Sequence, residues 1–345
     1  MSRRAPSPTV HVIGNVNVDL IMGPLAPWPQ PGTEHILPRS EMRVGGAAGN
    51  AGLAFQALGV SYRMVCNIGD DVFGRWMAKA FGPAGRGWPV APTPTTISVG
   101  VSHPNGERTF LTSQGHLTAM TLADAQERLP KRARAGDIAL LLGCFLSPCL
   151  LRSYESLIAL LVERGFEIAL DTGWPSGGWS ESLTRRVADW LQACDHLLLN
   201  EIESRSLSRQ PDVDAAAAWL LHKAKAGAAV VIKQGAQGAS AWRGGEKLHV
   251  PAPAVEVIDT IGAGDAFDAG YLAAHLAGRD LGAAVAQGVA VASAAISSSP
   301  RRYGPANSAG PLGPRLGTRD RREAVARSEA EVGRGPLHSK EEDDA

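Results

Sequence analysis

Residues 257–270 read VIDTIGAGDAFDAG, an apolar run that passes through Asp-Thr into Gly262-Ala263-Gly264 and then Asp265. The alanine-rich stretch that follows predicts that Asp265 lies at the start of a helix. The free N–H groups and partial positive charge of a helix N-terminus attract anions. A fixed carboxylate at this position can cap the helix, or it can be a base held beside an anion site.

The glycines of this stretch do not match two common phosphate-binding motifs. A P-loop needs a Gly-Lys dipeptide, and the sequence contains none. A dinucleotide fingerprint needs a third glycine at position 267, where Phe267 stands. We therefore predict that bare backbone N–H groups hold the phosphate here, without a P-loop lysine.

Composition excludes several classes of protein. The chain has 345 residues, 44% of them apolar, which is enough for a sizeable core. Its 34 basic and 34 acidic residues cancel, so no net charge points to nucleic acid or to an anionic membrane. Residues 1–8 lack the apolar core of a signal peptide, and no apolar run is long enough to span a bilayer. We therefore expect a cytoplasmic protein whose cysteines are reduced and mostly buried (Cys66, Cys144, Cys149 and Cys194).

Short apolar runs alternate with longer amphipathic or alanine-rich segments. The runs predicted as strands are 10–18, 63–68, 138–143, 167–171, 196–200 and 229–233. The segments predicted as helices are 47–58, 73–81, 150–164, 183–193, 213–226, 263–277 and 281–297. This alternation predicts an α/β fold with a doubly wound, mostly parallel sheet and helices on both faces. Ligands of such sheets bind at the carboxyl ends of the strands.

Three regions break the alternation. Residues 20–45 and 92–118 are rich in Pro, Gly, Thr and Ser and contain short alternating stretches. We interpret them as a small β-sheet lid over the site, with long loops as the alternative. Residues 311–345 are rich in charge and lack aromatic side chains, so burial cannot offset the entropy of ordering them. We predict a disordered tail at 311–345 after a domain that spans residues 9–310.

Polar side chains alternate along the first predicted strand. Asn15, Asn17 and Asp19 lie on one face of it, because side chains two residues apart in a strand share a face. Such groups are costly to bury unless they meet hydrogen-bonding partners, and a ligand rich in hydroxyls would supply them.

A second polar cluster opens the helix at 47–58. Gly45 and Gly46 allow close approach to the backbone, and Asn50 offers a bidentate amide from the first turn. Taken singly, each of these features is more typical of a turn or a cap. Together with the glycine-rich loop before Asp265, they predict a kinase site that contains side chains to bind the substrate's hydroxyls, a base and an anion hole.

Four motifs, in this order along the chain, resemble those of the ribokinase-like (PfkB) family of sugar and nucleoside kinases over roughly residues 9–310. They are Gly45-Gly46 to Asn50, Asn200-Glu201-Ile202-Glu203, the glycine loop from Lys233 to Gly238, and Asp259 to Phe267. The resemblance implies an ATP-dependent kinase that transfers the γ-phosphoryl group to a hydroxyl of a small sugar or sugar-like substrate. The alternatives are a nucleoside kinase of the same family and a sugar- or nucleoside-binding protein that has lost turnover.

The resemblance also implies a role for each motif residue. Asp265 would be the base, and the N–H groups of Gly262, Ala263 and Gly264 would form the anion hole. The residues that would bind the substrate are Asn17, Asp19, Gly45, Gly46 and Asn50. Those that would bind ATP and Mg²⁺ are Asn200, Glu203, Lys233, Gly235 and Gly238, with Glu203 acting on Mg²⁺ through water. The resemblance also allows a site for a monovalent cation such as K⁺, held by Asp259 and the carbonyl of Ile261. The lids of this family often pair two chains, so the resemblance also implies a homodimer.

The sequence departs from ribokinases proper at two places. They usually carry Lys after the glycine pair, where this chain has Ala47, and they tend to carry an acid where residues 143–146 are apolar. The substrate therefore stays a small sugar or nucleoside, and we expect neither nucleic acid nor membrane as a partner.

Overall fold

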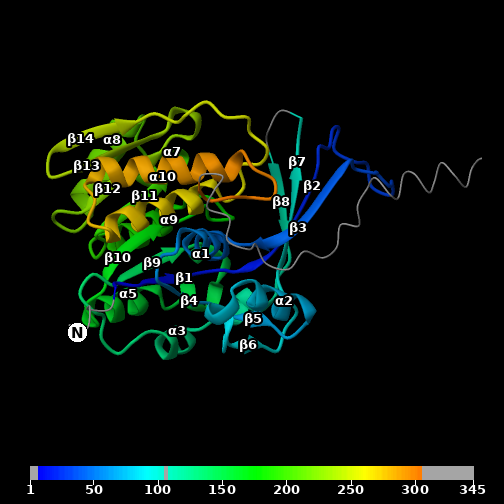
Figure 1. Ribbon diagram of the computed structural model, residues 1–345, viewed down its shortest axis with the longest axis horizontal. Coiled ribbons are helices and arrows are strands. Elements are labelled where there is room, and N and C mark those ends of the chain that lie inside the picture. The colour runs from blue at the N-terminus through cyan, green and yellow to red at the C-terminus, as the bar shows by residue number, and fades with distance from the viewer. Residues whose placement is uncertain (1–6, 105–107, 305–345) are drawn as a thin grey trace, which may run out of the picture. The chain divides into compact units, whose positions relative to one another are not determined.

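The computed structural model describes residues 7–104 and 108–304, and the predicted tail at 311–345 lies outside them. The described chain is built on an eight-stranded sheet in the order β14-β13-β12-β11-β10-β9-β1-β4 (Figure 1). Its strands are β1 (Val10–Ile13), β4 (Tyr62–Val65), β9 (Ile138–Leu142), β10 (Glu167–Asp171), β11 (His196–Asn200), β12 (Ala229–Lys233), β13 (Ala239–Arg243) and β14 (Glu246–Val250). All strands from β12 to β4 run parallel, and the last two are antiparallel to their neighbours.

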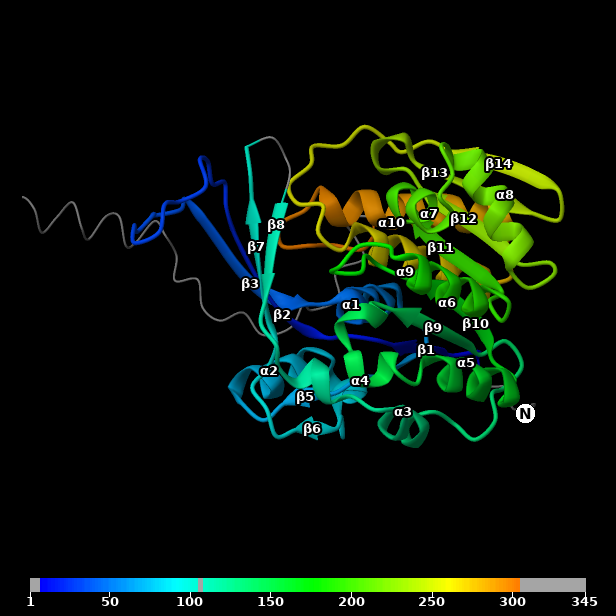
Figure 2. The same ribbon diagram turned by 180° about the vertical axis from the view of Figure 1, so that it is seen from behind.

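Helices cover both faces of this sheet (Figures 1 and 2). One core is formed with α1 (Ala47–Leu58), α2 (Val72–Ala80), α9 (Ala263–Leu276) and α10 (Leu281–Ile296). The other is formed with α3 (Leu122–Arg128), α4 (Pro148–Leu151), α5 (Tyr154–Glu163), α6 (Glu181–Leu191), α7 (Glu201–Ser208) and α8 (Val213–Lys223). Strand β9, IALLL, is buried along its whole length because it faces both cores. The predicted doubly wound α/β fold is confirmed.

A separate four-stranded sheet stands beside the main sheet (Figure 1). Its strands are β2 (Asn17–Gly23), β3 (Arg39–Gly45), β7 (Ile97–Ser102) and β8 (Arg108–Thr112), in the order β3-β2-β7-β8. Three of them fall within the two regions predicted as a small β-sheet. Two further short strands, β5 (Ile68–Gly69) and β6 (Val90–Ala91), pair with each other.

The predicted strand at 10–18 is in fact two strands in two sheets. Strand β1 ends at Ile13, and the chain enters the small sheet as β2 from Asn17. At Gly14 the backbone passes so close to the carbonyl of Leu142 that a β-carbon would overlap with its oxygen. The glycine therefore lets the chain leave the main sheet at the carboxyl end of β1.

The predicted helix at 150–164 is also divided. Helix α4 ends at Leu151 and α5 begins at Tyr154, because Ser153 has a non-helical backbone. The guanidinium of Arg186 donates a hydrogen bond to the carbonyl of Leu151, which satisfies the end of α4. The other predicted helices begin and end within a turn of their predicted limits.

The hairpin of β13 and β14 was not predicted, although the sequence contains its signal. Gly244 and Gly245 separate two short strands and have φ values of 58° and 85°, as a two-residue hairpin turn requires. Among the residues that the structure describes, strand β14 pairs only with β13, and so it forms one edge of the main sheet.

The cysteines lie where the sequence predicts. Cys66, Cys144 and Cys194 are free and buried, and Cys149 is free and partly exposed. Within residues 7–104 and 108–304, no helix has both the length and the apolar character needed to cross a membrane.

Candidate functional site

A cavity of about 1280 Å³ opens at the carboxyl ends of the parallel strands. The residues that line it at the ends of β9 to β12 include Gly143, Asp171, Asn200, Glu203 and Lys233, and those from the loop before α9 and its first turn are Thr260, Ile261, Gly262, Ala263, Gly264 and Asp265. Val289, Ala292 and Ser293 of α10, and the segment around residues 252–257, complete one wall. This is the location that the fold class predicts for a ligand.

The loop before α9 leaves backbone N–H groups without helical partners. Gly262 has φ 75°, a left-handed conformation that suits glycine, and it precedes the first residue of the helix. The first bond of the helical ladder runs from the N–H of Ala266 to the carbonyl of Gly262 (3.0 Å). The N–H of Ala263 donates to the carbonyl of Thr260 (3.2 Å). The N–H of Gly264 precedes the ladder and lies at the positive end of the helix, where anions are stabilised.

Asp265 lies in the first turn of α9, and one of its oxygens is already oriented. Asn50 of α1 donates from Nδ2 to Asp265 Oδ2 (2.9 Å). Burial, followed by the nearby charge of Asp171, raises the pKa of Asp265 to about 7. A carboxylate with such a pKa is suited to accept a proton near neutral pH.

Lys233 stands at the centre of an acidic cluster. Its Nζ lies 2.8 Å from Asp171 Oδ2 and 3.0 Å from Asp268 Oδ1. Burial alone would lower the pKa of Lys233, but these two carboxylates raise it, so the side chain is a permanent cation. A β-carbon on Gly264 would lie 3.3 Å from the same Nζ, which places this charge beside the glycine-rich loop.

Asn200 and Glu203 cap α7 as a reciprocal pair. The N–H of Glu203 donates to Asn200 Oδ1 (2.8 Å), and the N–H of Asn200 donates to Glu203 Oε2 (3.1 Å). Glu203 Oε1 and Asn200 Nδ2 take no part in this capping box. Burial, followed by the charge of Asp171, raises the pKa of Glu203 to about 7. The Asn200-to-Glu203 spacing, for which the family resemblance implies a role toward Mg²⁺, is thus also a helix-capping signal, which explains why α7 starts here.

The glycine loop after β12 connects β12 to β13. Gly235 has φ 58° and Gly238 has φ 101°. A β-carbon on Gly238 would also overlap with the carbonyl oxygen of Val250, so only glycine fits there. Lys233, Gly235 and Gly238 all line the cavity.

The polar side chains of the first strands form a buried chain of hydrogen bonds. Asn15 Nδ2 donates to Asn17 Oδ1 (3.0 Å), and Asn17 Nδ2 donates to Asp19 Oδ1 (2.7 Å). All three side chains are buried. Burial raises the pKa of Asp19 to about 6. These residues therefore do share one face, but Asn17 and Asp19 are not among the residues that line the cavity.

The glycine pair packs against this polar chain. A β-carbon on Gly45 would overlap with the carboxylate of Asp19, and one on Gly46 would lie 2.5 Å from Asn17 Oδ1. Neither glycine lines the cavity, and Asn50 reaches the site through its bond to Asp265. Ala47, the next residue, does line the cavity.

Two arginines surround Asp259. Arg43 Nη1 lies 2.6 Å and Arg301 Nη2 lies 3.1 Å from Asp259 Oδ2, and all three side chains are largely buried. Burial alone would raise the pKa of Asp259, but the guanidinium of Arg43 holds it below its usual value. The N–H of Ile261 donates to Asp259 Oδ1 (2.9 Å), so this carboxylate also fixes the loop before α9.

Four charged residues of the site were not predicted from the sequence: Asp171, Asp268, Arg43 and Arg301. Asp171 ends a correctly predicted strand at the carboxyl edge, and this position alone is a signal for a ligand-binding residue. Asp268 lies three residues after Asp265, one turn along the same helix. Arg43 and Arg301 carry no pattern that distinguishes them from surface arginines, so only the folded chain reveals them.

Comparison with known proteins identifies the family of this chain. The model of the family described as pfkB family carbohydrate kinase matches residues 7–305. A fructokinase from Rhizobium leguminosarum bv. trifolii is 31% identical over 240 residues, which are 66% of this chain and 70% of that protein.

Solved structures share the fold at lower identity. A protein from E. coli, solved in complex with ATP and Mg²⁺, superposes with a TM-score of 0.72 at 20% identity and covers 88% of this chain and 96% of its own. A fructokinase double mutant from Vibrio cholerae O395, solved with fructose, ADP and potassium ion, gives a TM-score of 0.70 at 22% identity, over 86% and 94% of the two chains.

Proposed function

The chain belongs to the pfkB family of carbohydrate kinases, and we propose from this premise that it transfers the γ-phosphoryl group of ATP to a hydroxyl of a small sugar with Asp265 as the base. As a member, the protein is a phosphotransferase that acts on a sugar hydroxyl. The observation that carries the residue assignment is the position of Asp265, which lines the cavity in the first turn of α9, directly after the glycine-rich loop that Lys233 approaches. One loop, residues 262–265, would then supply both the base and the anion site.

Asp265 would accept the proton of the attacking hydroxyl. Asn50 fixes one oxygen of the carboxylate, which leaves the other for the substrate. Proton acceptance by a positioned carboxylate increases the nucleophilicity of the hydroxyl oxygen as it approaches phosphorus.

The glycine-rich loop would hold the transferred group. In this proposal the N–H groups of Gly262 and Gly264 donate to the phosphoryl oxygens as negative charge develops there. Ala263 remains part of the same loop, although its own N–H is occupied by Thr260. Lys233 adds a fixed positive charge at the same end of α9.

Glu203 and Asn200 fit a site for Mg²⁺. Asp171, Glu203 and Asp265 all line the cavity, and burial, followed by the charge of Asp171, raises the pKa values of both Glu203 and Asp265. When bound, Mg²⁺ neutralises charge on the phosphates of ATP, and it retains several waters. Glu203, together with Asn200, would hold the ion through water.

The nucleotide would lie along the loop from Lys233 to Gly238. Gly235 and Gly238 both line the cavity, and a β-carbon on Gly235 would meet nothing within 4 Å, so a ligand can come close to the backbone there. Ala292 and Ser293 of α10 face the same cavity and would border the base and ribose of ATP.

The substrate would bind at the junction of the two sheets, where Asn17, Asp19, Gly45 and Gly46 meet. Asp19→Ala should weaken sugar binding by about one to three powers of ten, since a hydrogen bond to a charged group contributes about 1.5–3 kcal/mol. The effect should appear in the KM for the sugar and leave the affinity for ATP unchanged.

Separate titrations with the sugar and with an ATP analogue check this prediction. Asp70→Ala removes an exposed carboxylate (71% of its side chain) and serves as the matched control. If Asp19→Ala weakens the binding of both ligands equally, or of neither, Asp19 does not bind the sugar directly.

The pH profile should show the ionisation of Asp265. The carboxylate accepts a proton only when it is ionised, so kcat/KM should increase with pH and level off above about 7, the pKa of Asp265. Below that value the protonated fraction grows and kcat/KM should fall by about tenfold per pH unit. A profile that levels off near the ordinary Asp value of about 4 would contradict the assignment.

The surroundings of Asp259 do not fit a monovalent cation at its carboxylate, because Arg43 and Arg301 already balance its charge. We propose that these arginines fix the loop in place of K⁺. Rates measured in potassium chloride and in choline chloride at equal ionic strength should agree. An enzyme that requires K⁺ would show that the cation binds in spite of the arginines.

A coupled ADP-release assay across a panel of sugars and nucleosides tests the function itself. Fructose is the first sugar to test, because a relative at 31% identity is a fructokinase. We expect ADP release that depends on a sugar. Release with nucleosides alone would favour the nucleoside kinase, and a chain that binds ligands without turnover would be a binding protein.

Two further features remain predictions. Leu111 of β8 and Met42 of β3 are exposed on the same face of the small sheet, and we propose that this face pairs two copies into a homodimer. We also expect a cytoplasmic enzyme, where ATP is available and the free thiols stay reduced.

A further inference from the structure

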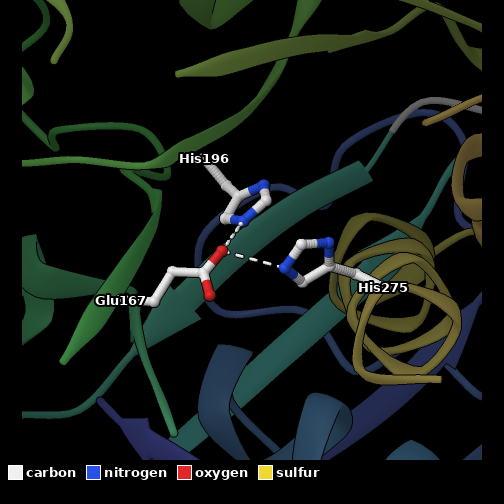
Figure 3. A group of neighbouring side chains, drawn as sticks. All are labelled: Glu167, His196 and His275. Atoms are coloured by element: carbon white, nitrogen blue, oxygen red, sulfur yellow. Dashed lines mark hydrogen bonds and ion pairs between the residues drawn. The ribbon is translucent and has the colours of Figure 1, made fainter. Parts of the chain in front are cut away.

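Three metal-ligating side chains meet at the amino ends of β10 and β11 (Figure 3). Glu167 Oε1 lies 2.6 Å from His196 Nε2 and 2.8 Å from His275 Nε2. The side chain of His196 is fully buried, whereas those of Glu167 and His275 keep 27% and 24% of their surface exposed. The cluster is therefore anchored in the core and also open to solvent on one side.

Three elements hold the cluster in place. The register of the sheet pairs Ala169 with His196, so Glu167, two residues before Ala169, points to the same face as His196. Tyr271 and His275 lie one turn apart on α9, which packs over this face. Their ring centroids are 5.5 and 4.5 Å from that of His196.

We propose that Glu167, His196 and His275 form a binding site for a divalent transition-metal ion, with Zn²⁺ as the first candidate. Two imidazoles and one carboxylate are ligands that Zn²⁺ accepts readily, whereas Mg²⁺ and Ca²⁺ prefer oxygen ligands alone. The three ligand atoms lie within 4.8 Å of one another. The exposed side of the cluster leaves a fourth position for water.

Both histidines can move their single ring proton from Nε2 to Nδ1, so the ion can bind to the Nε2 atoms of neutral imidazoles. Without a metal, both Nε2 atoms donate to Glu167. His196 can carry its proton on Nδ1 instead, because the hydroxyl of Tyr271 lies 2.8 Å away and can accept it. His275 can likewise carry its proton on Nδ1. The ion then replaces two N–H···O bonds without releasing a proton, and Tyr271 fixes the tautomer of His196.

Only small movements are needed. A tetrahedral ion with bonds of about 2.0–2.2 Å separates its ligand atoms by about 3.3–3.6 Å. Glu167 and His275 must therefore move apart from their present contacts by roughly 0.5–1 Å. Both side chains are partly exposed and therefore have room to rotate about their own bonds.

The cluster is separate from the kinase site. His275 follows Asp265 by ten residues on α9, which corresponds to about 15 Å along the helix axis. None of the three ligands lines the large cavity.

Calorimetric titration of the full, untagged chain with Zn²⁺ tests the proposal. Excess Mg²⁺ in the buffer reduces competition from the carboxylates of the cavity. We expect one Zn²⁺ per chain and a higher melting temperature with Zn²⁺ than without it. His275→Ala should abolish both effects. Tyr271→Phe, which keeps the ring, should weaken the affinity by about 10- to 100-fold.

His222→Ala provides the matched control, because His222 is an exposed histidine at the end of α8. Its zinc binding should equal that of the wild type. Circular dichroism confirms that each variant is folded, and alanine at 275 retains the helix. Failure of the wild type to bind Zn²⁺, or equal binding by His275→Ala, would overturn the proposal.

Discussion

The Asp265→Asn enzyme is expected to lose about 10²- to 10⁴-fold in kcat while it keeps its fold and its affinity for both substrates. Asparagine has nearly the same size and can still accept the hydrogen bond from Asn50. It cannot take the proton of the attacking hydroxyl. Steady-state ADP release should therefore show a reduced kcat with KM values near those of the wild type.

Asp280→Asn is the matched control for this substitution. Asp280 caps the neighbouring helix α10 by accepting from the N–H of Ala283 (2.7 Å), and asparagine caps equally well. Its kinetics should equal those of the wild type. If Asp265→Asn kept more than about a tenth of wild-type kcat, general-base catalysis by Asp265 would be ruled out.

Lys233→Met should destabilise the protein by about 3–5 kcal/mol, in addition to impairing catalysis. The substitution leaves Asp268, which is fully buried, and Asp171 without their cation. Chemical denaturation at neutral pH measures the change in the free energy of unfolding. The deficit should shrink as the pH falls, because protonation of Asp268 removes uncompensated charge from the interior.

Lys225→Met shows what an exposed pair contributes. Lys225 Nζ lies 2.6 Å from Asp195 Oδ1, but half of its side chain is exposed (51%). Its removal should cost only about 0–1 kcal/mol. If Lys233→Met also lowered the free energy of unfolding by less than about 1 kcal/mol, the stability of the buried cluster would not depend on its lysine.

Regular local patterns made most of the fold predictable. Strands β10, β11 and β12 and helix α1 have the predicted limits, because each is a short apolar run or an alanine-rich segment bounded by polar residues or glycine. The break at Gly14 was not predictable, since it depends on the carbonyl of Leu142, which is remote in sequence.

The candidate site was predictable where one motif contains all of its parts. The loop from Gly262 to Asp265 contains both the proposed base and the proposed anion site, so one short stretch of sequence was enough to predict both. The pairing of Lys233 with Asp171 and Asp268 joins three separate elements, and no local pattern specifies such a contact. No local pattern specifies the contacts of Arg43 and Arg301 with Asp259 either. These contacts are the reason why we now expect no K⁺ at this carboxylate.

The outermost strand of the main sheet, β14, has a consequence for how molecules of this protein behave toward one another. An open edge presents unpaired N–H and C=O groups that can recruit a strand from another molecule. This edge is only five residues long, and the side chains of Glu246, Lys247 and His249 are exposed along it. A foreign strand would have to approach past these hydrated, partly charged groups. The edge is therefore protected against intermolecular strand pairing, the first step toward aggregation.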